Sequence, residues 1–151
     1  MTILSRIIIE IVGSPKEHAS KVLETVLDKL RGEKGVKVMK ENVGEPQELK
    51  ELKGFWSTFA DLEIEIEELE KLLDICFDYM PSSIEIIEPQ SLNVDMRHMT
   101  NLVNDMLTRL HDYNMVIKNI HAENILLKKR LDSLEDKNLY KGEKTDEKNG
   151  A

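Results

Sequence analysis

The sequence predicts an α+β fold: a βαββαβ sandwich over residues 1–90, then a long coiled-coil helix over residues 94–136. Two patterns carry this prediction. In the first ninety residues, segments with an apolar residue at every second position alternate with segments whose apolar residues lie three and four apart, the periods of strands and helices. From Met96 to Leu134, steps of three and four then reach twelve positions, of which eleven are apolar; a 40% apolar composition would place about five there by chance.

The first strand and helix are predicted from residues 3–12 and 15–31. The strand is rich in β-branched residues, which favour sheets. Ser14 is predicted to cap the helix, with Pro15 at its first position and Glu17 completing a capping box. The predicted core face of the helix consists of Ala19, Val22, Leu23, Val26, Leu27 and Leu30.

Two further strands are predicted over residues 36–43 and 55–66, joined by a connector containing Pro46. Alternation assigns the two faces of the later strand. The face predicted to be buried carries Ala60, Leu62, Ile64 and Ile66, and the face predicted to be acidic and solvated carries Phe59, Asp61, Glu63 and Glu65.

A second amphipathic helix over residues 69–77, ended by Pro81, and a short strand over residues 84–88 complete the domain. This order resembles the ferredoxin-like fold, in which two helices cover one face of an antiparallel sheet. The likeness spans residues 3–89 and implies no function by itself. The segment 77–89, FDYMPSSIEIIEP, also resembles a small archaeal family of unassigned function.

The long helix predicts a homodimer, because apolar residues at the a and d positions of a heptad form the seam of a coiled coil. Asn124 is the one polar residue of the seam. In a parallel pair Asn124 meets its own copy and the two amides satisfy each other, so we expect a parallel dimer. The predicted dimerisation residues are Val103, Met106, Leu110, Tyr113, Ile117, Ile120, Asn124, Leu127, Leu131 and Leu134.

The flanks of this seam differ between its two halves. In the second half, Glu123 would reach the partner's Lys128 and Arg130 would reach the partner's Glu135, both attractive in a parallel pair. In the first half the apolar stripe is wider than a two-stranded coil needs, so we expect it to pack also against the N-terminal domain of its own chain or of the partner. The residues that widen it are Leu102, Leu107 and Val116.

Three apolar residues lie outside the seam. Met115 falls at position f, Ile125 at b and Leu126 at c of the heptad. Exposed apolar groups on a rod predict either a surface that binds a partner protein or a further step of self-association.

Charge favours a protein partner over nucleic acid. The net charge is −8, and residues 1–93 carry 19 acidic against 11 basic side chains. An acidic domain repels phosphate backbones but can bind basic proteins, including those of the ribosome. Residues 85–101 contain only one basic residue, Arg97, so we do not expect the coil to bind DNA as a basic zipper does.

The number of cysteines and the length of the apolar runs indicate the cellular compartment. Cys76 is the only cysteine, which excludes an intrachain disulfide and suits a reducing cytosol. No apolar run reaches the roughly eighteen residues of a membrane span, so the expected location is cytoplasmic, without membrane contact. The charged segment 137–151 is expected to be a disordered tail.

Two kinds of ligand-binding domain resemble this chain in part. The run Lys53-Gly54-Phe55 resembles the start of the third-strand signature of RNA-recognition motifs, but Ser57 stands where that family has a second stacking aromatic residue. Ligand-sensing ACT domains share the predicted fold and bind amino acids near a glycine-containing turn after the first strand. Here that turn, residues 13–15, is instead expected to serve the helix cap.

No catalytic, cofactor or metal site is predicted. The histidines His98, His111 and His121 fall at positions c, b and e of the heptad, and His18 belongs to another helix, so their spacing does not suit a metal. We therefore expect a non-catalytic homodimeric adaptor that binds a protein or a large assembly, with a ribosome as one example, through two heads. The alternative is an ACT-like dimer that senses a small molecule.

Overall fold

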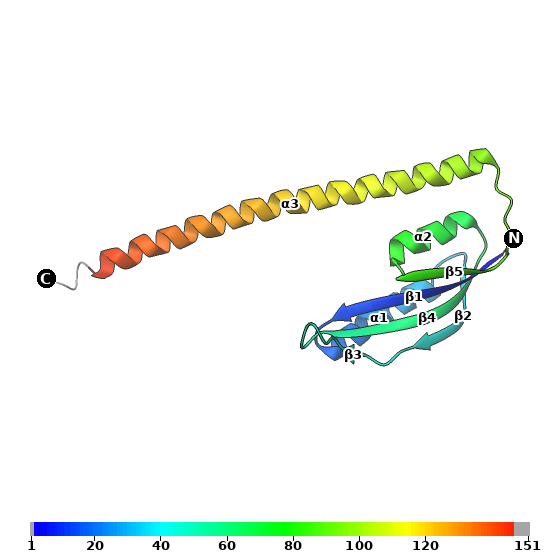
Figure 1. The fold of residues 1–151 in the computed structure, drawn as a ribbon, viewed down its shortest axis with the longest axis horizontal. Helices are drawn as coiled ribbons and strands as arrows, with labels where there is room; N and C mark the ends of the chain where they lie inside the picture. Colours follow the sequence, from blue (N-terminus) through cyan, green and yellow to red (C-terminus); the bar gives the residue numbers. More distant parts are fainter. Residues whose placement is uncertain (1, 147–151) are drawn as a thin grey trace. The chain divides into compact units, whose positions relative to one another are not determined.

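The computed structural model describes residues 2–146, with side chains described up to residue 137. The chain divides into two compact units, Met1–Leu102 and Val103–Ala151. The first unit contains an antiparallel sheet, two helices and the first turns of a third helix; the second continues that third helix (Figure 1). The predicted α+β class with a long C-terminal helix is confirmed.

The sheet has five strands, all paired antiparallel. Four strands follow the order β2-β4-β1-β5, and β3 pairs with β4 beside this path. The short β3 was not predicted, because two residues are too few to show a period of two. The strands are β1 (Ile3–Gly13), β2 (Val36–Val43), β3 (Gln47–Glu48), β4 (Trp56–Ile66) and β5 (Ser83–Glu88).

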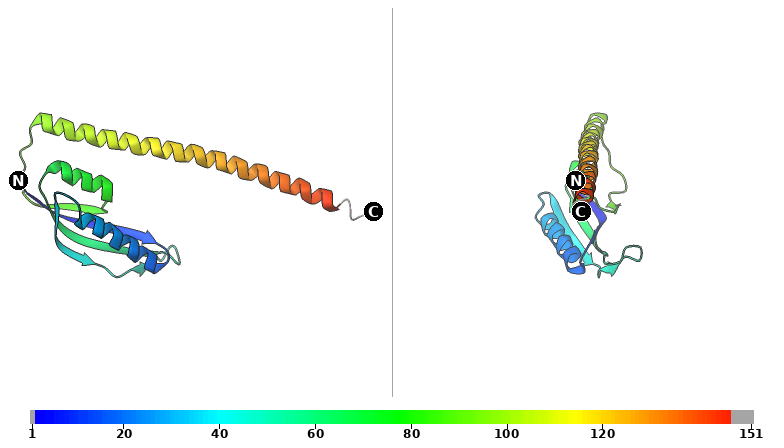
Figure 2. Two further views of the ribbon diagram at one scale, coloured as in Figure 1. Left: turned by 180° about the vertical axis from the view of Figure 1, so that it is seen from behind. Right: turned by 90° about the vertical axis from the view of Figure 1, so that its left-hand side faces the viewer.

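The core lies on one face of this sheet, as the alternation in β4 predicted. Ile7 of β1 is aligned with Leu62 of β4, and Ile9 with Ala60, and all four side chains are fully buried. Helices α1 (Lys16–Arg31) and α2 (Leu69–Tyr79) cover this face, so the first unit has two layers (Figure 2). The helices contribute Leu23, Leu27, Leu30, Leu72 and Ile75 to the core.

The start of α1 differs from the prediction. The helix begins at Lys16 with Pro15 as its N-cap, and no side chain caps it, so the proposed roles of Ser14 and Glu17 are wrong. The carbonyl of Pro15 instead accepts the backbone N–H groups of His18 and Ala19, at 3.0 and 3.2 Å.

Helix α3 (Met96–Asp146) is longer than predicted. It begins where the Asp95 carboxylate accepts the backbone N–H of His98, at 2.9 Å, which is a typical N-cap contact. It continues ten residues beyond the predicted end at 136; no proline interrupts this segment, and the helix passes through Gly142. Residues 137–146 are therefore helical, and residues 147–151 of the predicted tail lie outside the described residues.

Among the residues that the structure describes, no helix combines the length and the apolar character that crossing a membrane requires.

Candidate self-association surface

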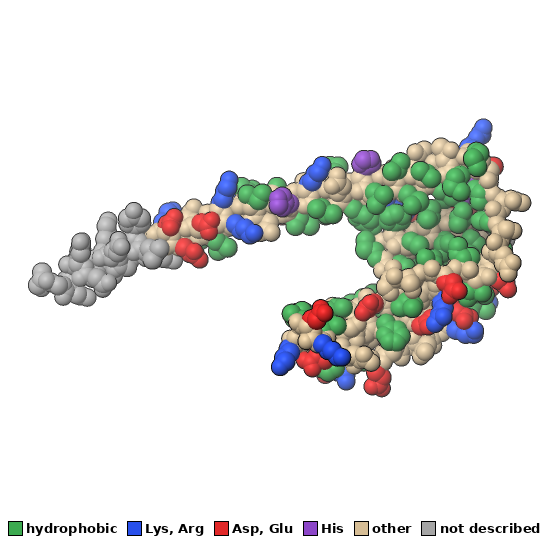
Figure 3. All heavy atoms as spheres, in the orientation of Figure 1, with side chains coloured by type: hydrophobic (Ala, Val, Ile, Leu, Met, Phe, Trp, Pro, Cys, Tyr) green, Lys and Arg blue, Asp and Glu red, His purple; other side chains and the backbone are tan. Residues whose placement is uncertain are grey.

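The predicted seam forms one continuous stripe along α3, because the whole segment is a single uninterrupted helix. Within the described chain most of this stripe is uncovered. Val103, Leu110 and Ile117 at position a are 45–64% exposed, and Ile120, Leu127 and Leu134 at position d are 56–59% exposed. Figure 3 shows such hydrophobic side chains at the surface along the helix. Met106 and Tyr113 are partly covered, and Leu131 is 58% exposed.

Asn124 is exposed on the same stripe, flanked by charged side chains that are also exposed. Its amide has both donors and an acceptor available for a second copy. The flanking residues at positions e and g are those that the parallel arrangement requires: Glu123, Lys128, Arg130 and Glu135.

Of the three residues that widen the stripe in its first half, one is buried and two are exposed. Leu102, the last residue of the first unit, is 4% exposed and belongs to the buried set of that unit. Leu107 and Val116, in the second unit, are 48% and 54% exposed. The expectation that these two pack against the N-terminal domain stays a prediction.

The three predicted partner-binding residues lie outside the seam and are exposed. Met115 and Leu126 are 62% and 56% exposed, and Ile125 is 43% exposed. Met115 and Leu126 share the side of α3 opposite the seam, since eleven residues bring a helix back to nearly the same angle. Ile125 lies at the edge of this side.

The open face of the sheet carries a row of alternating charges that sequence analysis missed. Lys40, Glu63, Arg6 and Glu85 are cross-strand neighbours on β2, β4, β1 and β5. Lys40 Nζ lies 2.7 Å from a Glu63 carboxylate oxygen, and Arg6 Nε donates to Asp61 at 2.8 Å. The Arg6 guanidinium lowers the pKa of the Asp61 carboxyl. Since these cations pair within the sheet, the face offers little to attract phosphate.

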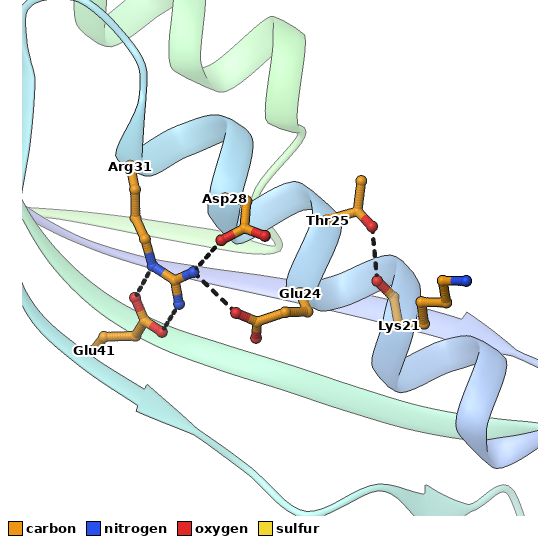
Figure 4. A network of polar contacts seen from close by, with 6 residues as sticks. All are labelled: Lys21, Glu24, Thr25, Asp28, Arg31 and Glu41. Carbon is orange, nitrogen blue, oxygen red and sulfur yellow. Dashed lines mark hydrogen bonds and ion pairs between the residues drawn. The ribbon is translucent and has the colours of Figure 1, made fainter.

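A second ion network ties α1 to β2 on the other face (Figure 4). Arg31 donates to Glu24 and Asp28 of its own helix, at 2.9 and 2.6 Å, and to Glu41 of β2. These carboxylates raise the pKa of Arg31, with Glu41 as the largest contributor. The sequence alone could have identified Arg31 as a basic residue at the C-terminal end of α1. It could not have identified Glu41 as its partner, because that contact depends on where β2 lies in the sheet.

Glu33, in the loop after α1, binds two residues of α2. Its carboxylate accepts hydrogen bonds from Lys71 Nζ at 2.6 Å and Tyr79 Oη at 2.9 Å. The Lys71 contact is the main cause that lowers the pKa of Glu33, and burial together with Glu33 raises the pKa of Tyr79. Through these contacts Glu33 connects the C-terminal end of α1 to α2.

The remaining reactive side chains are dispersed. His98 Nε2 lies 3.2 Å from a Glu70 carboxylate oxygen, beside a shallow hollow that Asp95 also lines. His111 and His121 are exposed. Cys76 is half-buried and burial raises the pKa of its thiol. Over the described residues, no group of three potential ligands is arranged to hold a metal ion.

Comparison with known proteins identifies a family to which the chain is similar. A family model described as the MJ0538 family matches residues 5–147, and no function is assigned to that family. This confirms the expected likeness to an archaeal family of unassigned function. No curated protein and no solved structure matches the chain.

Proposed function

The chain belongs to the MJ0538 family, and we propose that it is a non-catalytic cytoplasmic adaptor, a parallel homodimer joined through α3 that presents two copies of its first unit to a protein partner. The observation that carries this proposal is the uncovered seam on α3. A 51-residue helix with a continuous apolar stripe is expected to associate with another helix in water, because association buries the stripe.

The free energy of burying the seam favours association of two α3 helices. Completing the burial of a half-exposed Leu or Ile contributes on the order of 1 kcal/mol. The nine apolar residues among the predicted dimerisation residues, taken from each of two chains, therefore supply about 18 kcal/mol. This exceeds the roughly 4–15 kcal/mol of rotational and translational freedom that association costs.

Orientation follows from Asn124. In a parallel pair this residue faces its own copy, whereas in an antiparallel pair it would face an apolar side chain. Leaving a buried amide unsatisfied costs about 1–3 kcal/mol, which is enough to bias otherwise similar arrangements. The two g-to-e charge pairs add smaller contributions in the same direction.

We also infer that the first unit is a ferredoxin-like sandwich with β3 as a small addition. Without β3, the order β2-β4-β1-β5 with two helices on one face corresponds to that fold. Because a parallel coil begins at the same end in both chains, it holds the two sandwiches at one end of the dimer.

The partner we propose is a basic protein surface, such as one on the ribosome. Each first unit carries the excess of acidic residues that gives the chain its net charge of −8. Two weakly binding heads on one dimer raise the effective concentration for the second contact, so bivalency supplies affinity that one head lacks.

Sedimentation equilibrium at micromolar concentration tests the dimer. The full chain should contain at least a dimer, and Ile117→Glu, which places two charges in one seam layer, should yield monomers. Asn114→Glu, one position outside the seam core, is the matched control and should remain associated. A monomeric wild-type chain would overturn the proposal.

Co-sedimentation with ribosomes in cell extract tests the partner. The wild-type chain should sediment with the large particles in a salt-dependent manner, and the Ile117→Glu variant should bind at least about tenfold more weakly because it lacks bivalency. A raised melting temperature in a metabolite screen, with no co-sedimentation, would favour the ACT-like sensor instead.

A further inference from the structure

The side of α3 opposite the seam is unusual for a surface helix. Between Tyr113 and Leu127 the only charged residues are Lys118 and Glu123, whereas most residues from 128 to 137 are charged. Coiled coils normally carry charged or polar residues on this outward side. We call this side the outer face and define it by Asp112, Met115, Asn119, Ala122, Leu126 and Lys129, all of which are exposed.

These six residues recur in steps of three and four, so they form a second heptad stripe on the same helix. Within a parallel dimer the seam is buried and the outer face stays in water. The exposed Met115 and Leu126 are then left without a partner of their own kind, about 16 Å apart along the helix.

We propose that the outer face binds the outer face of a second dimer, antiparallel, about a twofold axis that passes between residues 120 and 121. This rests on the proposed function, since it takes the parallel dimer as the unit that associates. In a twofold contact each residue meets a residue that meets it in return. Met115 then lies opposite the second dimer's Leu126, and Asn119 opposite its Ala122.

The charges at the two ends of the stripe agree with this register. Asp112 lies opposite the second dimer's Lys129, an attractive pair at each end of the contact. Thr108 and Ser133, one step further out, also lie opposite each other and can pack without charge conflict. Beyond them Asp105 would meet Asp136, so the contact ends there.

Other registers fit less well. Moving the second helix by one heptad in one direction places Asp112 opposite Asp136, and in the other direction places Leu126 opposite Thr108. A parallel contact would set Asp112 against its own copy and Lys129 against its own copy, which repel. The small Ala122 and the uncharged Asn119 at the centre allow the helices to approach closely. One antiparallel register therefore satisfies both the apolar and the charged residues.

The geometry predicts how the assembly grows. The two helices of a coiled coil carry their outer faces on opposite sides of the rod, so each dimer has two such surfaces. Association can continue sideways into a ladder of antiparallel rods. Neighbouring dimers then carry their acidic first units at opposite ends, which keeps like charges apart.

Sedimentation velocity of the full chain from low to high micromolar concentration tests this. The wild-type mass should rise in steps of a dimer. Met115→Glu with Leu126→Glu should give a dimer at every concentration, while Asn114→Glu with His121→Glu, which adds two charges outside the outer face, should leave the steps in place. Circular dichroism confirms that each variant keeps its helix.

Charge reversal tests the register. Asp112→Lys and Lys129→Asp should each weaken the association of dimers by about tenfold, and the variant carrying both should restore it. A parallel outer contact predicts that the single reversals change little, so that result would overturn the antiparallel register.

The outcomes separate the two proposals. A wild-type chain that stays a strict dimer overturns this inference and leaves the parallel dimer standing. If Met115→Glu with Leu126→Glu produces monomers, the outer face is itself the dimer contact, and the parallel seam is overturned instead.

Discussion

Asn124 is the residue on which the orientation of the proposed dimer depends. Its place in an otherwise apolar seam lowers stability, because an amide pair contributes less than a packed leucine pair. In return, Asn124 makes the orientation of the two helices specific, since only the parallel arrangement satisfies both amides.

Asn124→Leu should therefore raise the melting temperature of the coil and admit other arrangements, such as antiparallel pairs and trimers. Thermal unfolding followed by circular dichroism, together with sedimentation equilibrium, measures both effects. A variant that remains a strict parallel dimer would contradict the role assigned to this amide.

Glu33 predicts a pH dependence of the first unit. Because Lys71 and Tyr79 bind its carboxylate, its pKa is lower in the folded than in the unfolded chain. A carboxyl with a depressed folded pKa stabilises the fold above its ordinary pKa, and this contribution is lost as the pH falls through the folded value. Glu33→Gln should thus reduce the stability at neutral pH and flatten its decline below about pH 4.5. Urea titrations at several pH values test this, with the exposed Glu17→Gln as control.

At the scale of elements, the two-layer core of the first unit was predictable because alternation in a strand reports burial directly. Leu62, at the centre of β4, lies on the predicted face and is fully buried. What the pattern could not indicate was β3, nor the partner that β2 would provide for Arg31, since both depend on which strands become neighbours.

Leu62→Ala should destabilise the first unit by about 2–5 kcal/mol, because it removes buried methyl groups and leaves a cavity. Chemical denaturation followed by tryptophan fluorescence can report it, since the single Trp56 begins the same strand. Thr108→Ala, an exposed position of α3, should change the unfolding of this unit little.

At the scale of the whole molecule, the two units differ in what completes them. The first unit has a core of its own, built from residues 3–102, although Ile84, Ile86 and Ile87 of β5 are exposed. The second leaves its apolar stripes in water, and in the proposed dimer another copy covers the seam.

A chain of residues 1–102 should consequently fold cooperatively, because it contains a complete core. A chain of residues 103–151 should be helical only where its concentration allows association. Circular dichroism over a range of concentrations distinguishes the two. A helical content of the second fragment that does not change on dilution would show that α3 does not depend on self-association.

The sequence by itself determined the α+β class, the faces of the strands and the stripe on α3, because each follows from local periodicity that any reader of the residues can trace. The tertiary structure decided the strand order, the backbone cap of α1 by Pro15 and the cross-strand charge row on the open face. The strand order and the charge row depend on residues far apart in the chain becoming neighbours, whereas the cap of α1 is a matter of local backbone geometry. A period in the sequence shows which side of an element is apolar, whereas the element that meets that side is set by packing of the whole unit.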